Sequence, residues 1–145
     1  MSGPSAVRVG DEIPDWVMAD VRPERMRTTA AILRDPNPIH WDREVTEARG
    51  LGGRVINQGP LDVGYLANML MAWQGPTCIR RLGLQFPGPV LDHDHITARG
   101  VVTAVDLDEG TATCDVWLER DDGFRPVLGT AVVALAARGD AVRRR

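Results

Sequence analysis

The feature that most constrains the fold is the segment INQGPLDVGYLANMLMAW, residues 56–73. Pro60 stands where a helix would begin, since proline is favoured at the first helical position, and only Gly64 could weaken the helix that follows. One helical face carries Leu61, Gly64, Ala67 and Met71, and Val63, Leu66 and Leu70 lie beside it. A helix that is apolar around most of its circumference belongs in the middle of a domain, so other elements must pack around it.

The segments that follow this helix read as β-strands. Residues 78–87, 94–106, 111–120 and 125–137 are rich in apolar and β-branched residues and are separated by turn-like sequences. Alternating positions such as Val116 and Leu118 favour antiparallel strands with one face covered. Residues 15–22 could form a further strand, and 23–34 and 43–49 read as helices. This order predicts an α+β architecture, an antiparallel sheet wrapped around a long central helix.

Length and composition limit the classes of function. A chain of 145 residues is expected to form one domain, here residues 1–138, followed by a short arginine-rich tail at 139–145. A net charge of −3 gives no global basic field, which disfavours nucleic acid or an anionic membrane as partner. We find no signal-peptide core and no bilayer-length apolar stretch, so we expect a soluble, cytoplasmic protein. Cys78 and Cys114 lack metal-ligand spacing and are expected to be reduced, packed thiols.

The stretch RDPNPIHWD, residues 34–42, combines an acid, a base and two prolines. Asp35 and Asn37 each precede a proline, which pushes both residues out of the helical region of backbone space. The turn is therefore stiff between Asp35 and His40. A stiff turn suits a pair of groups that must be held still.

This stretch and the start of the long helix together resemble the MaoC-like, or (R)-specific enoyl-CoA hydratase, family of the hotdog fold. The family pattern is an aspartate, any residue, Asn-Pro, an aliphatic residue and a histidine, followed about twenty residues later by a glycine that opens the long helix. Here the pattern is filled by Asp35, Asn37, Pro38, Ile39, His40 and Gly59. The chain departs from the family at Leu33 and Arg34, where Ser-Gly is usual, at Gln58, often histidine, and at Ala67, often small and polar.

The resemblance implies a hydro-lyase that adds or removes water at a 2-enoyl or 3-hydroxyacyl thioester. The acyl group would be carried by coenzyme A or an acyl-carrier-protein arm, with no other cofactor and no metal. Asp35 and His40 would line the site, Gly59 would stabilise the thioester oxyanion, and Asn37, Gln58 and Ala67 would bind substrate or position loops. The family also implies a dimer, either with a second copy or with another hotdog chain.

The chemistry of these residues is consistent with that reaction. Hydration requires a water to lose a proton, an α-carbon to gain one, and an enolate-like oxygen to be stabilised in between. Asp35 and His40 could share one water, and the sequence leaves open which of them activates it. Because Pro60 has no N–H, the donor at the helix entrance must be Gly59 or a residue after Pro60.

Two other functions remain open. Asp62 falls in the first helical turn, where an acid stabilises the helix dipole, yet thioesterases of this fold commonly use an acid on this helix. The chain could also be a non-catalytic subunit of a heteromeric dehydratase.

Several further polar and aromatic residues could have either a functional or a purely structural role. The DHDH stretch at 92–95 is read as a polar turn rather than a metal site. Arg54, Arg80 and Arg81 could contact phosphates or simply be solvated. Trp41 could wall an acyl pocket or pack in the core or at an interface.

Overall fold

The computed structural model describes residues 6–136, and its strands form one five-stranded sheet. All strand pairs are antiparallel, in the order β1-β3-β4-β5-β2. In chain order the elements are β1 (Glu12–Met18), α1 (Pro23–Leu33), the 3-10 helix η1 (Pro38–His40), α2 (Arg43–Ala48), α3 (Gly59–Gln74), β2 (Ile79–Gln85), β3 (Ile96–Asp106), β4 (Thr111–Arg120) and β5 (Val127–Ala134). The predicted α+β architecture is confirmed.

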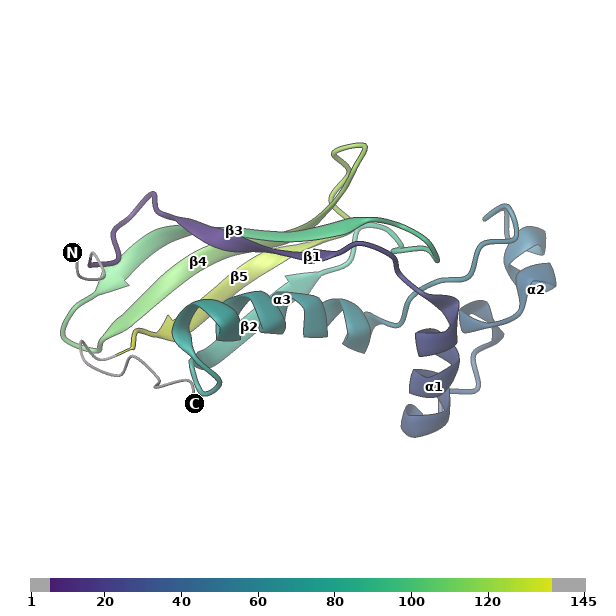
Figure 1. Ribbon diagram of the computed structural model, residues 1–145, viewed down its shortest axis with the longest axis horizontal. Coiled ribbons are helices and arrows are strands. Elements are labelled where there is room, and N and C mark those ends of the chain that lie inside the picture. Colours follow the sequence, from purple (N-terminus) through teal and green to yellow (C-terminus); the bar gives the residue numbers. More distant parts are fainter. Residues whose placement is uncertain (1–5, 137–145) are drawn as a thin grey trace.

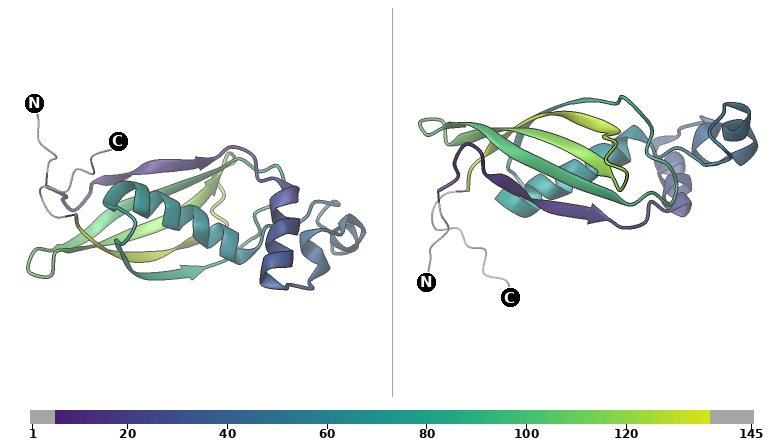
Figure 2. Two further views of the ribbon diagram at one scale, coloured as in Figure 1. Left: turned by 60° about the horizontal axis from the view of Figure 1, so that its bottom comes forward. Right: turned by 90° about the horizontal axis from the view of Figure 1, so that it is seen from above.

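The long helix α3 lies along one face of the sheet, as Figures 1 and 2 show. Its buried apolar side chains, Tyr65, Leu66, Met69 and Leu70, join the core formed by the inner faces of the strands. Tyr65 stacks on Trp16 of β1, with ring centroids 5.5 Å apart. Full burial of each large aliphatic side chain contributes about 1.5–3 kcal/mol, so this side of α3 holds the layers together.

The structure shows which side of α3 faces the sheet, which the sequence leaves open. The face with Leu61, Ala67 and Met71 is only half-buried, whereas the side that carries Asp62 and Leu70 is turned to the sheet. The sheet of a single chain covers one side of the helix, so an apolar pattern on most sides cannot tell which side that is. A half-buried apolar stripe therefore remains on α3.

The first strand begins earlier than the sequence predicts. β1 runs from Glu12 to Met18 rather than over 15–22, and its register with β3 shifts between Ile13 and Trp16. Pro14 lies inside that irregularity. A proline is tolerated there because β1 is an edge strand and a bulge leaves no ladder hydrogen bond to be donated.

Gly129 leaves no room for a side chain between β5 and β2. A Cβ at Gly129 on β5 would lie 2.0 Å from the carbonyl oxygen of Gly83 on β2. Any side chain at Gly129 would force the two strands apart. β2 pairs only with β5 and so forms an edge of the sheet within the described chain.

Both cysteines are buried as free thiols. Cys78 follows α3 and Cys114 lies on β4, and burial raises the pKa of the Cys114 thiol to about 11. The predicted tail at 139–145 lies outside the described residues. Within residues 6–136 no helix is both long and apolar enough to span a membrane.

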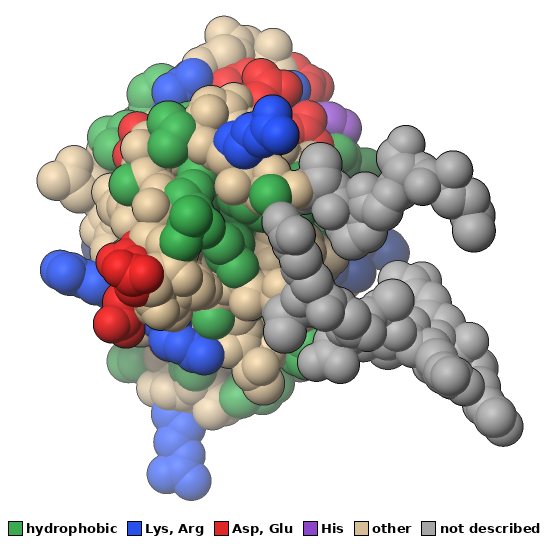
Figure 3. All heavy atoms as spheres, turned by 90° about the vertical axis from the view of Figure 1, so that its left-hand side faces the viewer, with side chains coloured by type: hydrophobic (Ala, Val, Ile, Leu, Met, Phe, Trp, Pro, Cys, Tyr) green, Lys and Arg blue, Asp and Glu red, His purple; other side chains and the backbone are tan. Residues whose placement is uncertain are grey.

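The elements that connect β1 to α3 lie together at one end of the molecule. In Figure 1, α1 and α2 are at the right, and the turn between β3 and β4 is at the left. Figure 3 looks at that left-hand end, where hydrophobic side chains gather at the centre of the face. The predicted acid and base, Asp35 and His40, are on the segment between α1 and α2.

Candidate active site

The turn after α1 is fixed by its own backbone. Arg34 closes the helix in the left-handed conformation, with φ 53°, and the N–H of Asp35 donates to the carbonyl of Ala30 at 2.9 Å. The N–H of Asn37 then donates to Oδ1 of Asp35 at 3.0 Å, and the Oδ1 of Asn37 accepts from the N–H of Ile39 at 3.3 Å. Asn37 thus caps η1 and orients the carboxylate that precedes it.

Asp35 and His40 come into contact across this turn. The Nε2 of His40 lies 3.2 Å from the Oδ2 of Asp35, and the side chains are 10% and 28% exposed, respectively. The Nδ1 of His40 lies 2.7 Å from the carbonyl oxygen of Ile56. A carbonyl can only accept, so Nδ1 carries a proton and Nε2 faces the carboxylate. A hydrogen bond between Nε2 and Oδ2 then needs one further proton, which either group can hold.

The loop before α3 brings the second half of the predicted motif to this pair. Ile56 accepts from His40, and its own N–H donates to the carbonyl of Ile39 at 3.0 Å. Gly59 follows three residues later as the first residue of α3. The first N–H groups of a helix have no intrahelical acceptor, and no acceptor within residues 6–136 takes the N–H of Gly59. This N–H is therefore available to an external acceptor.

Two predicted substrate-binding residues lie differently from each other. Gln58 is fully buried, and its Nε2 donates to the carbonyl of Met26 at 2.7 Å, which ties the start of α3 to α1. Its Oε1 has no partner within the described chain. Ala67 is half-buried on α3, eight residues after Gly59 and therefore about 12 Å further along the helix axis. The structure does not bring Ala67 into contact with the Asp35–His40 pair.

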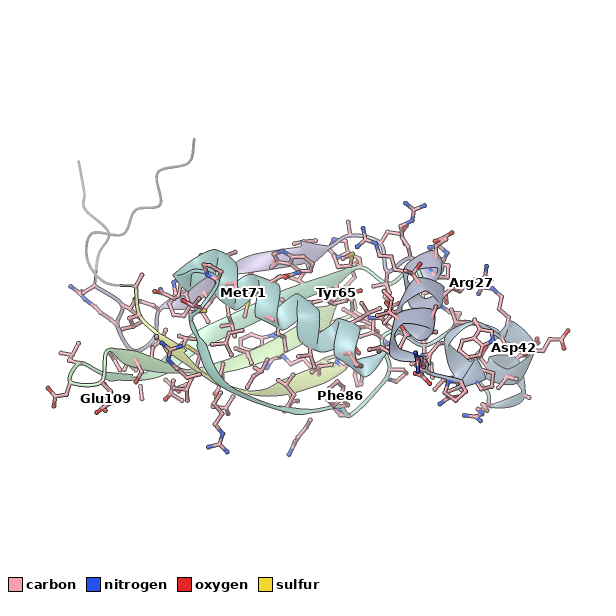
Figure 4. The ribbon with its side chains drawn as sticks, turned by 90° about the horizontal axis from the view of Figure 1, so that it is seen from below. Arg27, Asp42, Tyr65, Met71, Phe86 and Glu109 are labelled. Atoms are coloured by element: carbon pink, nitrogen blue, oxygen red, sulfur yellow. The ribbon has the colours of Figure 1, made fainter. Side chains whose placement is uncertain are left out.

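A buried polar cluster lies at the start of α3 and consists of Asn57, Asp62 and Tyr65. The Nδ2 of Asn57 donates to Oδ1 of Asp62 at 2.7 Å and lies 3.3 Å from the hydroxyl of Tyr65. Burial raises the pKa of Asp62 to about 7, against the opposing effect of the Asn57 hydrogen bond, and burial also raises the pKa of Tyr65. Figure 4 shows Tyr65 on α3, alongside the sheet. Asp62 is therefore a buried acid, without an ion-pair partner among the described residues.

A shallow groove of about 470 Å³ opens beside Asp35. Its lining, which we call the α1 groove, consists of Arg27, Ala30, Ala31, Asp35 and Trp41. A larger hollow of about 750 Å³ lies over β2, β4 and β5, but no predicted site residue lines it. We favour the α1 groove as part of the site because the candidate catalytic carboxylate of Asp35 lines it.

The acidic and basic side chains of the DHDH stretch, residues 92–95, form ion pairs with other parts of the chain. Asp92 is buried and lies 2.9 Å from Nη1 of Arg43 and 3.7 Å from Nε of Arg54. Arg54 also pairs with Asp94 at 2.8 Å and bonds to the backbone carbonyl of Asp92. The Nδ1 of His93 lies 2.9 Å from the exposed Asp20, and its Nε2 lies 3.9 Å from Asp92. These contacts join the loop before α3 to the β2–β3 connection and leave Arg54 committed to two acids.

Three features of the site were not identified from the sequence: the Ile56 carbonyl, Asn57 and the α1 groove. The Ile56 carbonyl and Asn57 are ordinary residues whose role depends on contacts with distant segments, and no local pattern marks them. The groove, in contrast, has a signal: Ala30 and Ala31 follow Arg27 by three and four residues, so the three share one face of the predicted helix that ends just before Asp35.

The chain is similar to known families and structures. The model of the MaoC like domain matches residues 6–117. A curated relative, the 3-oxo-4,17-pregnadiene-20-carboxyl-CoA hydratase beta subunit of Mycobacterium tuberculosis, is 33% identical over 79 residues. That match covers 54% of this chain and 60% of the relative.

Solved structures match over most of the described fold. The (R)-hydratase from A. caviae involved in PHA biosynthesis has a TM-score of 0.77 and 28% identity, over 90% of this chain and 98% of that one. A chain of the ChsH1–ChsH2 complex of Mycobacterium tuberculosis matches with a TM-score of 0.77 and 26% identity. The match covers 90% of this protein and 99% of that chain.

Proposed function

Because the chain belongs to the MaoC-like domain family and has its hotdog fold, we propose that it is a hydro-lyase acting on an acyl thioester. It would add water to a 2-enoyl group or remove it from a 3-hydroxyacyl group. The observation that carries the proposal is the 3.2 Å contact between Asp35 and His40, with the ring fixed from behind by the Ile56 carbonyl. Coenzyme A or an acyl-carrier-protein arm would hold the acyl group, with no other cofactor.

In the proposed hydration, the pair transfers two protons in sequence. One member takes a proton from water as the hydroxyl oxygen forms a bond to the β-carbon, and the π electrons move toward the thioester oxygen. The other member donates a proton to the α-carbon as the carbonyl reforms. The pair ends with as many protons as it began with, and the short Nε2–Oδ2 contact provides a route for redistributing them.

The proposed oxyanion donor is the N–H of Gly59. It is free within the described chain and lies at the positive end of a 16-residue helix. A Cβ at Gly59 would meet only the ring of Phe86, at 3.7 Å, so the described chain leaves room for a substrate group to approach this point. Removing a donor of this kind typically costs about 3–4 kcal/mol of transition-state stabilisation.

We further propose that the working form is a dimer, with a second copy or a different hotdog chain. The half-buried stripe on α3 and the edge strand β2 are surfaces that such a partner would cover. One of the similar structures is a complex, ChsH1–ChsH2 of Mycobacterium tuberculosis.

The rival thioesterase function would use Asp62. The structure favours it less, because Asp62 is 4% exposed and its carboxylate is hydrogen-bonded to Asn57 rather than turned toward the α1 groove. A carboxyl group with a pKa of about 7 could nevertheless act as an acid or base if substrate reached it.

The deciding experiment supplies crotonyl-CoA to wild type, Asp35→Asn, His40→Gln and Asp62→Asn, and follows both enoyl absorbance and free thiol. Loss of enoyl absorbance that depends on Asp35 and His40, with an (R)-3-hydroxy product, is the expected result. Release of free CoA that depends on Asp62 would replace the proposal with the thioesterase. Product formation unaffected by either Asp35→Asn or His40→Gln would refute the assigned pair.

A further inference from the structure

The α1 groove is lined by one cation, Arg27, and by the carboxylate of Asp35 that we assign to the reaction. Arg27 lies within α1, whereas Asp35 follows the end of the helix and is held against its last turn, because its N–H donates to the carbonyl of Ala30 at 2.9 Å. Ala30 and Ala31, one turn after Arg27, also line the groove, and their small side chains leave it open beside the two charged groups. Trp41 completes the lining. Figure 4 shows Arg27 on α1.

The guanidinium of Arg27 is not committed to another residue. Within residues 6–136 it forms no ion pair or hydrogen bond, whereas Arg43 and Arg54 are held by Asp92 and Asp94. Glu24, one turn earlier, lies 3.7 Å from Arg22 instead. Arg80 and Arg81, also considered for phosphate contacts, lie on β2 and do not line the groove. Arg27 is thus the arginine of the groove that is free to bind an anion.

The opposite charges of Arg27 and Asp35 in the groove fix the direction in which a ligand with an anionic group binds. A phosphate would be repelled by the carboxylate of Asp35 and attracted to Arg27, which can form two parallel hydrogen bonds to it. The opposite end of that ligand would then lie at Asp35 and His40, where the proposed reaction takes place. The indole of Trp41 offers an apolar wall to the part in between.

We propose that the α1 groove binds the phosphopantetheine arm of the thioester substrate, with Arg27 holding the phosphate and the thioester lying at Asp35. This inference rests on the proposed function and adds the specific residue that recognises the substrate's handle. The arm ends in a phosphate both in coenzyme A and on an acyl carrier protein, so Arg27 recognises chemistry that the two carriers share. The arm runs from that phosphate to the sulfur that carries the acyl group, so a phosphate held by Arg27 directs the thioester along the groove toward Asp35.

The test uses three crotonyl thioesters that differ only in the handle: coenzyme A, 4′-phosphopantetheine and pantetheine. Arg27→Gln is expected to raise KM about five- to twentyfold for the two phosphorylated thioesters, to leave kcat unchanged, and to leave the pantetheine thioester unaffected. Arg22→Gln is the matched control, since it removes one positive charge from the exposed surface just before the same helix. Ala31→Phe, which fills the groove, should raise KM for all three.

Other outcomes overturn the assignment. A KM increase confined to the coenzyme A thioester would place Arg27 on the nucleotide instead of the shared phosphate. An equal increase for the pantetheine thioester, or the same increase in Arg22→Gln, would reduce the effect to structure or bulk charge.

If wild type hydrates none of the three thioesters, the proposed function fails but the groove can still be tested. Isothermal titration with coenzyme A, 4′-phosphopantetheine and pantetheine is then decisive. Binding of the first two that is weakened by Arg27→Gln keeps the groove as a phosphopantetheine site. Equal or absent binding of all three removes it.

Discussion

Asp35 and Asp62 are two carboxylates near the start of α3 with opposite surroundings. Asp35 is partly open to the α1 groove and contacts an imidazole at 3.2 Å, whereas Asp62 is buried and bonds only to a neutral amide. Burial without a counter-charge favours the protonated acid, so Asp62 is expected to stay largely neutral up to about pH 7. Contact with a base and access to solvent are what make Asp35, rather than Asp62, suited to exchanging protons with a substrate.

The largest expected effect is on the exposed pair. Asp35→Asn and His40→Gln should each lower kcat for crotonyl-CoA hydration about 10³-fold, because each removes a group that accepts or donates a proton in the reaction. Circular dichroism and thermal unfolding should show that both variants remain folded. A decrease in kcat of less than tenfold in either variant would contradict the catalytic role assigned to Asp35 and His40.

The buried acid should instead control stability. The pKa of Asp62 is about 7 in the folded protein, against 3.8 for an aspartate free in water, so the unfolded chain releases this proton first as pH rises. Wild type should therefore lose up to about 4 kcal/mol of unfolding free energy between pH 4 and pH 7 from this residue. Asp62→Asn should abolish that loss. Urea unfolding across this pH range measures it, and an unchanged pH dependence would contradict a neutral, buried Asp62.

Gly59 separates catalytic from structural effects at the same helix end. Gly59→Ala should lower kcat/KM about 10- to 100-fold if a thioester carbonyl must approach this N–H closely. Stability should hold or rise slightly, since the new Cβ meets only Phe86 at 3.7 Å. The matched variant Gly129→Ala, whose Cβ would collide with the Gly83 carbonyl, should lower the melting temperature and serves as the structural control. Equal losses of stability in both would argue against an open approach at Gly59.

The smallest effect concerns the edge of the buried cluster. Tyr65→Phe removes a hydroxyl 3.3 Å from Asn57 and keeps the stacking on Trp16. We expect a change in unfolding free energy of about 0.5–1 kcal/mol and no change in kcat. A large loss of activity in this variant would mean that the cluster reaches the substrate, which would revive the role of Asp62 in catalysis.

The contrast between the two acids also explains how far the sequence could be read. The approach of Asp35 to His40 follows from a short turn that two prolines and the Asn37 cap stiffen, so local chemistry is enough to predict it. The start of α3 was equally predictable, because a Gly-Pro pair marks a helix entrance. The strand segments after α3 were found for a similar reason, since turn residues separate them.

Features that depend on distant contacts could not be read in the same way. His40 is oriented by Ile56, sixteen residues away, through a backbone carbonyl that any residue would supply. The side of α3 that faces the sheet cannot be read from the sequence, because apolar residues occupy most of its circumference. The burial of Asp62 follows from that orientation, and so its raised pKa was equally invisible.

The two buried thiols can be used to measure how often the structure around each of them opens. Cys114 is 0% exposed on a central strand and Cys78 is 2% exposed at the end of α3, so a labelling reagent reaches either only when the structure around it opens. Labelling of Cys114 requires the middle of the sheet to come apart, whereas Cys78 can react when only the connection between α3 and β2 frays. The ratio of their modification rates therefore compares the cooperativity of the sheet with that of the helix packed on it.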